Sequence, residues 1–131
     1  MTMDDSRLIR NCDLGGGITA TVHDGTRHYF GGYYHVQLYI AAEVPVTADL
    51  FASDDEYADA CSRLGGTVVF RRTLEKMAVP EEEITSVRTH LLENFENHLL
   101  PYLQRGTFCA GFVISEYRRS LKTTQRGYRQ T

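Results

Sequence analysis

Apolar and polar residues alternate in three short runs between residues 18 and 44, and each run predicts a β-strand. Successive side chains of a strand point to opposite faces of the sheet, so alternation with period two indicates a strand with one buried face. The runs cover residues 18–23, 26–30 and 35–44. The third is the clearest, because one of its faces carries Val36, Leu38, Ile40, Ala42 and Val44.

Glycine and proline residues separate these runs. Asp24-Gly25 lies between the first two, and Asp-Gly is typical of a two-residue hairpin turn, in which both turn residues take positive φ. We therefore expect residues 18–23 and 26–30 to pair antiparallel. Gly31-Gly32 indicates either a bulge or a second tight turn. Pro45 cannot donate a hydrogen bond to a neighbouring strand, so the third strand is expected to end there.

Helical spacing occurs in two places. Ser53 followed by Glu56 has the spacing of a capping box, which predicts a helix that ends at Gly65-Gly66. A longer helix begins near Pro80, and its apolar residues recur every three or four positions at Ile84, Val87, Leu91, Phe95 and Leu99. Because proline in a helix interior costs about 3 kcal/mol, Pro101 predicts an end or a kink near Leu100.

Residues 67–77 and 108–116 complete the predicted strands, and the order of elements is β-β-β-α-β-α-β. This order predicts an α+β fold: an antiparallel sheet of about four to five strands, with one long C-terminal helix packed on one face and a shorter helix between strands. A chain of 131 residues is most simply one domain, 1–131. We expect flexible ends at about residues 1–14 and 118–131, and a flexible joint at Gly15-Gly16-Gly17.

Composition narrows the class of protein. Hydrophobic residues make up 42% and charged residues 24% of the chain, which is ordinary for a soluble globular protein. The chain has no apolar run long enough for a transmembrane helix, and residues 1–11 lack the apolar core of a secretory signal. The cysteines lie far apart without a C-x-x-C pair, which argues against a zinc ribbon or a disulfide framework and favours a reducing cytoplasm.

The formal net charge of −3 at pH 7 is unevenly spread. Residues 117–131 contain no acid but five bases: Arg118, Arg119, Lys122, Arg126 and Arg129. The acidic body argues against general nucleic-acid binding, since phosphate neutralisation by lysine and arginine supplies most of that affinity. A nucleic acid or another acidic partner is therefore expected only through this basic tail.

His23, Asp24 and His28 form the candidate metal site. In a hairpin that turns at Asp24-Gly25, His23 and His28 lie on one face of adjacent strands, within reach of each other. Two imidazoles and a carboxylate can hold a divalent metal with open positions for water, and a metal-bound hydroxide could hydrolyse a small molecule. The alternative is a polar, solvated hairpin face.

Tyr33, Tyr34, His35 and Tyr39 are the candidate ligand-binding residues. Aromatic side chains with polar tips suit ligand pockets and interfaces alike, although strand packing explains the same residues without a ligand. Two further sets of candidate residues also have an explanation that involves no function. His90 with Asn94 also suits a solvated helix face, and Cys61 and Cys109 also suit core packing.

The chain contains no phosphate-binding glycine loop, nucleophile elbow or zinc-protease motif, and it indicates no particular cofactor. We therefore expect a non-catalytic binding or interaction module that acts as a homo-oligomer, because an exposed apolar sheet face tends to be buried by a partner. The alternative is a small-molecule enzyme or metal-dependent hydrolase that uses the His23/His28 hairpin face.

Overall fold

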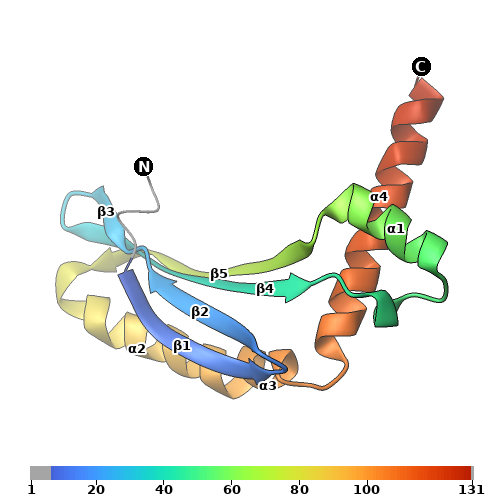
Figure 1. Cartoon of the computed structure of the whole chain (residues 1–131). Coiled ribbons are helices and arrows are strands. Elements are labelled where there is room, and N and C mark those ends of the chain that lie inside the picture. The colour runs from blue at the N-terminus through green and yellow to red at the C-terminus, as the bar shows by residue number, and fades with distance from the viewer. Residues whose placement is uncertain (1–6, 131) are drawn as a thin grey trace. The chain divides into compact units, whose positions relative to one another are not determined.

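The computed structural model describes the backbone of residues 7–130 and the side chains of residues 7–123. It shows an α+β protein with a five-stranded antiparallel sheet, which confirms the predicted fold class (Figure 1). The strands are β1 (Arg7–Gly15), β2 (Ile18–Asp24), β3 (Arg27–Phe30), β4 (Tyr33–Pro45) and β5 (Thr67–Pro80). The helices are α1 (Asp54–Leu64), α2 (Ile84–Asn94), α3 (Leu100–Leu103) and α4 (Phe108–Gln130), with a π-helical segment at Phe95–Leu99 and 3-10 turns at Ala48–Leu50 and Glu81–Glu83.

The chain divides into two compact units. The first unit consists of Met1–Ala42 and Arg71–Arg105, and it holds most of the sheet together with α2 and α3. The second unit consists of Glu43–Phe70 and Gly106–Thr131, and it holds α1 and α4. β4 and β5 contribute residues to both units. The expectation of a single domain stays a prediction.

β4 is the central strand of the first unit. β2 and β3 lie one after the other along one edge of β4, β1 lies beyond β2, and β5 pairs with β4 as well. The predicted hairpin at Asp24-Gly25 is therefore wrong, because β2 and β3 both run antiparallel to β4 and do not pair with each other. The Gly25 backbone N–H donates to the Gln37 carbonyl at 2.9 Å, and neither Asp24 nor Gly25 has the positive φ that the turn requires.

The chain reverses direction at two glycine turns instead. Gly16 and Gly17, with φ of 63° and 81°, connect β1 to β2, so the predicted flexible joint is a hairpin turn. Gly31, with φ of 56°, connects β3 to β4, which confirms the tight turn predicted there. The loose lead-in predicted for residues 1–14 is wrong for residues 7–14, which belong to β1. Residues 1–6 lie outside the described residues.

One face of this sheet is buried beneath the helices. Alternate side chains of β2 and β4 are almost fully inaccessible: Ala20, Val22, Val36, Leu38, Ile40 and Ala42. We call the side that carries them the inner face. Phe95 and Leu103 are fully buried in the same unit, and α2 and α3 run along this face of β1 and β2 (Figure 1). Arg10 Nε donates to Glu96 Oε2 at 3.2 Å and Gln104 Nε2 donates to the Asp13 carbonyl at 3.1 Å, so polar contacts fasten β1 to these helices.

Pro101 lies within helical structure that continues to Leu103, so the helix does not end near Leu100 as one alternative predicted. Proline has no N–H to donate to the preceding turn and its ring crowds the carbonyl one turn back. The backbone widens into a π-helical segment at Phe95–Leu99, just before the proline. Such a segment accommodates an interrupted hydrogen-bond ladder without ending the helix.

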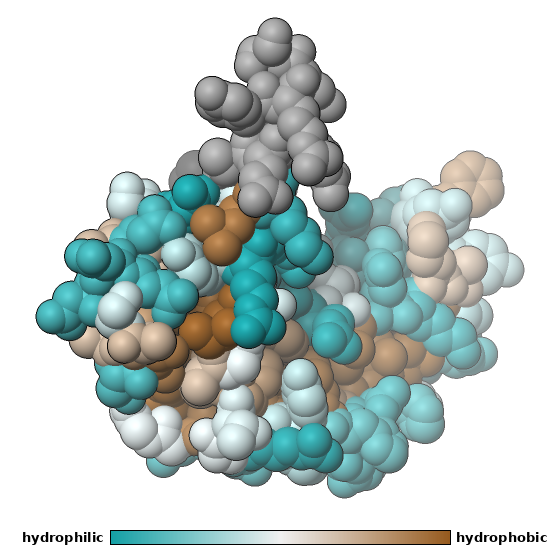
Figure 2. All heavy atoms as spheres, turned by 90° about the vertical axis from the view of Figure 1, so that its right-hand side faces the viewer, coloured by the Kyte–Doolittle hydropathy of each residue, from teal (hydrophilic) through white to brown (hydrophobic). Residues whose placement is uncertain are grey.

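The second unit confirms one predicted helix and corrects one predicted strand. Ser53 caps α1, since its Oγ accepts from the Glu56 N–H at 3.1 Å, and Gly65 ends the helix with φ of 82°. Residues 108–116 are not a strand, because they belong to α4, which continues to Gln130. The flexible end expected at residues 118–131 stays a prediction. Val113 and Tyr117 of α4 are buried together with Ala60 of α1. Figure 2 looks onto the side where α1 and α4 lie and shows apolar side chains among hydrophilic ones.

Among the described residues, no helix is both long and apolar enough to cross a membrane.

Candidate functional site

The predicted ligand-binding residues lie in the first unit, at the start of β4, and side-chain alternation separates them. His35 and Tyr39 point to the face opposite Val36 and Leu38, which we call the outer face. Tyr34 points to the inner side, where its ring packs edge-on against the His28 ring with centroids 5.4 Å apart. Tyr33 is 47% exposed beside the turn. The structure therefore brings His35 and Tyr39 to one face but does not gather all four residues into one pocket wall.

Four polar side chains form a hydrogen-bonded row on the outer face, which we call the outer-face network: His35, Gln37 and Tyr39 of β4 with Glu75 of β5. His35 Nε2 lies 2.6 Å from Glu75 Oε1, and Gln37 Nε2 donates to the same oxygen at 3.2 Å. The Tyr39 hydroxyl donates to Gln37 Oε1 at 2.7 Å. His35 and Gln37 are 9% and 7% exposed, so these bonds satisfy polar groups that water scarcely reaches.

Glu75 anchors the network electrostatically. Hydrogen bonds from His35 and then from Gln37 hold the pKa of the Glu75 carboxyl below its ordinary 4.5, although partial desolvation opposes the shift. The carboxylate is therefore charged at neutral pH and accepts a hydrogen bond from His35 Nε2. When the His35 imidazole is neutral, Nε2 is then its donor and Nδ1 its acceptor, so Glu75 sets the tautomer and the orientation of the ring.

The predicted metal ligands are not brought together by the structure, because the hairpin on which their proximity depended does not form. His23 pairs with Tyr39 and points to the outer face, whereas its neighbour Asp24 points inward. His28 packs on the inner side against Tyr34, and its Nε2 lies 2.5 Å from the Gly31 carbonyl oxygen. Among the side chains of residues 7–123, no three or more His, Cys, Asp or Glu residues are grouped so that they could hold a metal ion.

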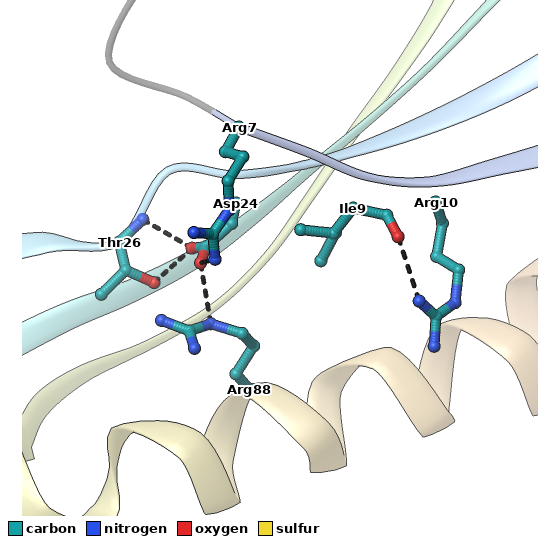
Figure 3. A network of polar contacts seen from close by, with 6 residues as sticks. All are labelled: Arg7, Ile9, Arg10, Asp24, Thr26 and Arg88. Atoms are coloured by element: carbon teal, nitrogen blue, oxygen red, sulfur yellow. Dashed lines mark hydrogen bonds and ion pairs between the residues drawn. The ribbon is translucent and has the colours of Figure 1, made fainter.

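Asp24 is instead the centre of an ion-pair cluster (Figure 3). Its carboxylate accepts from the Thr26 backbone N–H at 3.0 Å and from the Thr26 hydroxyl at 2.6 Å. Arg88 Nε of α2 lies 2.8 Å from Asp24 Oδ2 without an aligned hydrogen bond, and Arg7 of β1 lies 3.8 Å from the same oxygen. Asp24 is 8% exposed, and a buried carboxylate needs such partners. The cluster links β1, β2 and α2, which is a structural role.

The cysteine and helix-face candidates show no sign of activation. Burial raises the pKa of the Cys109 thiol and is also the main cause of the raised pKa of Cys12. A nucleophilic cysteine needs the opposite shift. Cys61 packs partly buried against the core of the second unit. His90 and Asn94 lie exposed on α2.

The basic tail belongs to α4 as far as residue 130. A shallow hollow of about 630 Å³ in the second unit is lined in part by Thr107, Ser115, Arg118, Arg119 and Lys122. Arg119 also contacts Glu116 at 3.4 Å, so one of these charges is already partly balanced. The side chains of Arg126 and Arg129 lie outside those the structure describes. Binding of a nucleic acid or another acidic partner here stays a prediction.

Sequence reasoning missed two members of the outer-face network and the partner of Asp24. Gln37 follows His35 by two positions, so strand alternation alone could have placed them on one face. Glu75 lies in β5, where the sequence predicts a strand over residues 67–77, but its contact with His35 depends on the register between β4 and β5. Arg88 lies 64 positions after Asp24 in the sequence. No local pattern encodes either of these long-range contacts.

No protein-family model, curated protein or solved structure matches the chain. The fold and the site therefore define a class in physical terms, namely a small α+β protein with a paired His–Glu network on one face of its sheet. The surfaces that this sheet presents are the features from which a function can be inferred.

Proposed function

We propose that this protein is a non-catalytic interaction module that acts as a homo-oligomer. The observation that carries the proposal is β5, a strand of 14 residues that pairs with β4 along one edge. No strand in the described part of the chain pairs with its other edge. The backbone groups along an unpaired strand edge are a template for pairing with another chain.

The β3–β4 hairpin supports a binding role. Tyr29, Phe30 and Tyr33 flank its glycine turn and are 54%, 73% and 47% exposed. Tyrosine and phenylalanine are enriched where proteins contact one another. An aromatic side chain that stays exposed to water contributes little hydrophobic stabilisation to the fold. Their exposure supports the proposal that these side chains contact a partner.

The alternative, a metal-dependent hydrolase on the His23/His28 face, has no geometric support, because β2 and β3 place these two side chains on opposite sides of the sheet. The outer-face network suits binding, since its histidine and amide are held by neighbours within the sheet. We also propose a reducing, cytoplasmic setting, in which Cys12, Cys61 and Cys109 keep the free thiols that the structure shows.

Sedimentation velocity of untagged protein over a wide concentration range tests this proposal. We expect the weight-average mass to rise with concentration from the monomer mass of 14.9 kDa toward at least twice that value. A single 14.9-kDa species at every concentration would contradict homo-oligomerisation.

A further inference from the structure

In the first unit, β5 stays extended over residues 71–77. Every side chain in this segment except Leu74 is exposed, and Ala78, with φ of 56°, interrupts the extended backbone directly afterwards. β1 and the four-residue β3 are the other outer strands of the described sheet. The pairing of β1 with β2 shifts register after Leu8 and again after Asp13, and the pairing of β3 with β4 shifts after His28. Bulges of this kind blunt a strand edge against further pairing. β5 is therefore the edge better suited to accept another strand.

Side-chain alternation divides this edge into two rows. Glu75 contacts His35 on the outer face, so Arg71 and Thr73 belong to the same outer row. Arg72, Leu74 and Lys76 alternate with them and form the inner row. Side chains that face each other directly across two paired strands lie on the same side of the sheet, so an incoming strand has to match both rows.

A second copy of the chain can pair with β5 in few ways. Two identical strands related by a twofold axis use the same surface, so each contact occurs twice. When the two copies continue one antiparallel sheet, the outer row of one must meet the outer row of the other. One residue then faces its own counterpart at the axis. The register is specified completely by this central residue.

Charge excludes most central residues. Centring the pair on any of the charged residues Arg71, Arg72, Glu75 or Lys76 would place that residue opposite its own copy, and like charges directly opposite are destabilising. Centring it on Met77 would require pairing on both sides of Ala78, where the positive φ interrupts the extended backbone. Centring the pair on Leu74 would place Arg72 opposite Lys76, which is again a like-charged pair.

Thr73 remains, and we propose that two copies of this protein pair through β5 in an antiparallel register centred on it. Arg71 of each copy then faces Glu75 of the other, which gives two ion pairs related by symmetry. Arg72 faces Leu74, so no like charges are opposed in either row between residues 71 and 75. The inference rests on the proposed function, since it names the second copy and the strand it uses.

The second copy also completes the outer-face network. The Glu75 side chain is 49% exposed, and both of its bonds within the chain, to His35 and to Gln37, end on Oε1. Oε2 is therefore the oxygen that this carboxylate presents to Arg71 of the second copy. An arginine that approaches Oε2 joins the network without displacing an existing bond.

Reciprocal charge reversal tests the register. Arg71→Glu turns both ion pairs into repulsive Glu–Glu pairs, and we expect it to weaken dimerisation measured by sedimentation equilibrium about tenfold or more. The double variant Arg71→Glu/Glu75→Arg restores opposite charges in both pairs, and we expect it to recover the dimer. Lys76→Glu makes the same charge reversal in the inner row and is the matched control, which we expect to keep the dimer.

Disulfide trapping tests the same register by distance. Directly opposed residues of antiparallel strands have Cα atoms about 4.5–5.5 Å apart, which is within the range of a disulfide. Mild oxidation of Thr73→Cys is therefore expected to yield a covalent dimer above the background of the wild-type chain. Lys76→Cys is the control, because its two copies lie about 20 Å apart in this register and are expected not to cross-link.

The outcomes separate this inference from the proposed function. A protein that dimerises but is insensitive to Arg71→Glu, or that cross-links at Lys76→Cys and not at Thr73→Cys, overturns the β5 register and leaves homo-oligomerisation standing. A wild-type chain that is monomeric at every concentration overturns both. A folding defect caused by Arg71→Glu would not be repaired by a second charge reversal at Glu75. Recovery of the dimer in the double variant therefore supports the register.

Discussion

At the residue scale, Gly25 shows why a strong local signal failed. A Cβ atom built on Gly25 would overlap the ring of Tyr39. The missing side chain is therefore used for close approach of an aromatic ring, and not for the positive φ of a hairpin turn. Asp24 supplies the local bend, because its carboxylate accepts hydrogen bonds from Thr26. The Asp-Gly dipeptide is compatible both with a hairpin turn and with the bend between β2 and β3. Pairing of both strands with β4 determines which of the two forms.

Gly25→Ala is expected to lower the free energy of unfolding by about 1–3 kcal/mol, as overpacking does in a well-packed site. The added methyl group must displace the Tyr39 ring, which also strains the bond from its hydroxyl to Gln37. Urea denaturation measures the change. Gly32→Ala is the matched control, since its Cβ would meet no atom within 4 Å. Equal stability of the two variants would contradict this interpretation.

Glu75 makes the stability of the fold depend on pH, and the direction of its pKa shift gives the sign. Its folded-state pKa lies below the ordinary 4.5 because His35 and Gln37 hydrogen-bond the charged form. Its contribution to stability is therefore complete above about pH 4.5 and is lost as the pH falls through the lower folded-state value. The Tm difference between wild type and Glu75→Gln should be largest near neutral pH and shrink on acidification. Glu43→Gln, at an exposed carboxylate of β4, controls for the lost charge, and a constant difference for Glu75→Gln would contradict the network.

At the scale of the elements, the sequence predicts those whose pattern is local. β4, α1 and β5 were found because alternation, a Ser53 cap and β-branched residues are visible within a few positions. α4 was mistaken in its first half for a strand, since the run Phe112, Val113, Ile114 fits either period when considered alone. β1 was missed because polar and apolar residues are mixed along it, which obscures the alternation that identifies a strand.

The burial of aromatic side chains within the elements predicts which of them stabilise the fold. Phe95, at the start of the π-helical segment, is fully buried, so Phe95→Ala is expected to cost about 3–5 kcal/mol of unfolding free energy. Phe30 in the β3–β4 hairpin is 73% exposed, and Phe30→Ser is expected to stay within about 0.5 kcal/mol of the wild type. Chemical denaturation at one fixed protein concentration compares them. A large loss for Phe30→Ser would assign the hairpin a structural role and remove its support for partner binding.

At the scale of the whole molecule, the functional surfaces come from pairings that no local pattern encodes. The predicted metal site failed because it assumed that β2 pairs with β3, whereas both strands pair with β4. The predicted ligand-binding set was divided because residues adjacent in sequence point to opposite faces of one strand. What remains is a sheet in which the pairings of the outer strands β1 and β3 contain register shifts, whereas the outer strand β5 stays extended through residues 71–77. The central claim is that a second copy covers this regular edge.

Amide hydrogen exchange measured at low and high protein concentration tests this claim most directly. Pairing with a second copy protects backbone N–H groups that a monomer leaves to water, so exchange in residues 71–77 should slow as the concentration rises. β1 is an outer strand too and serves as the internal control, with exchange that should not change. Identical exchange of residues 71–77 at both concentrations would contradict pairing through β5.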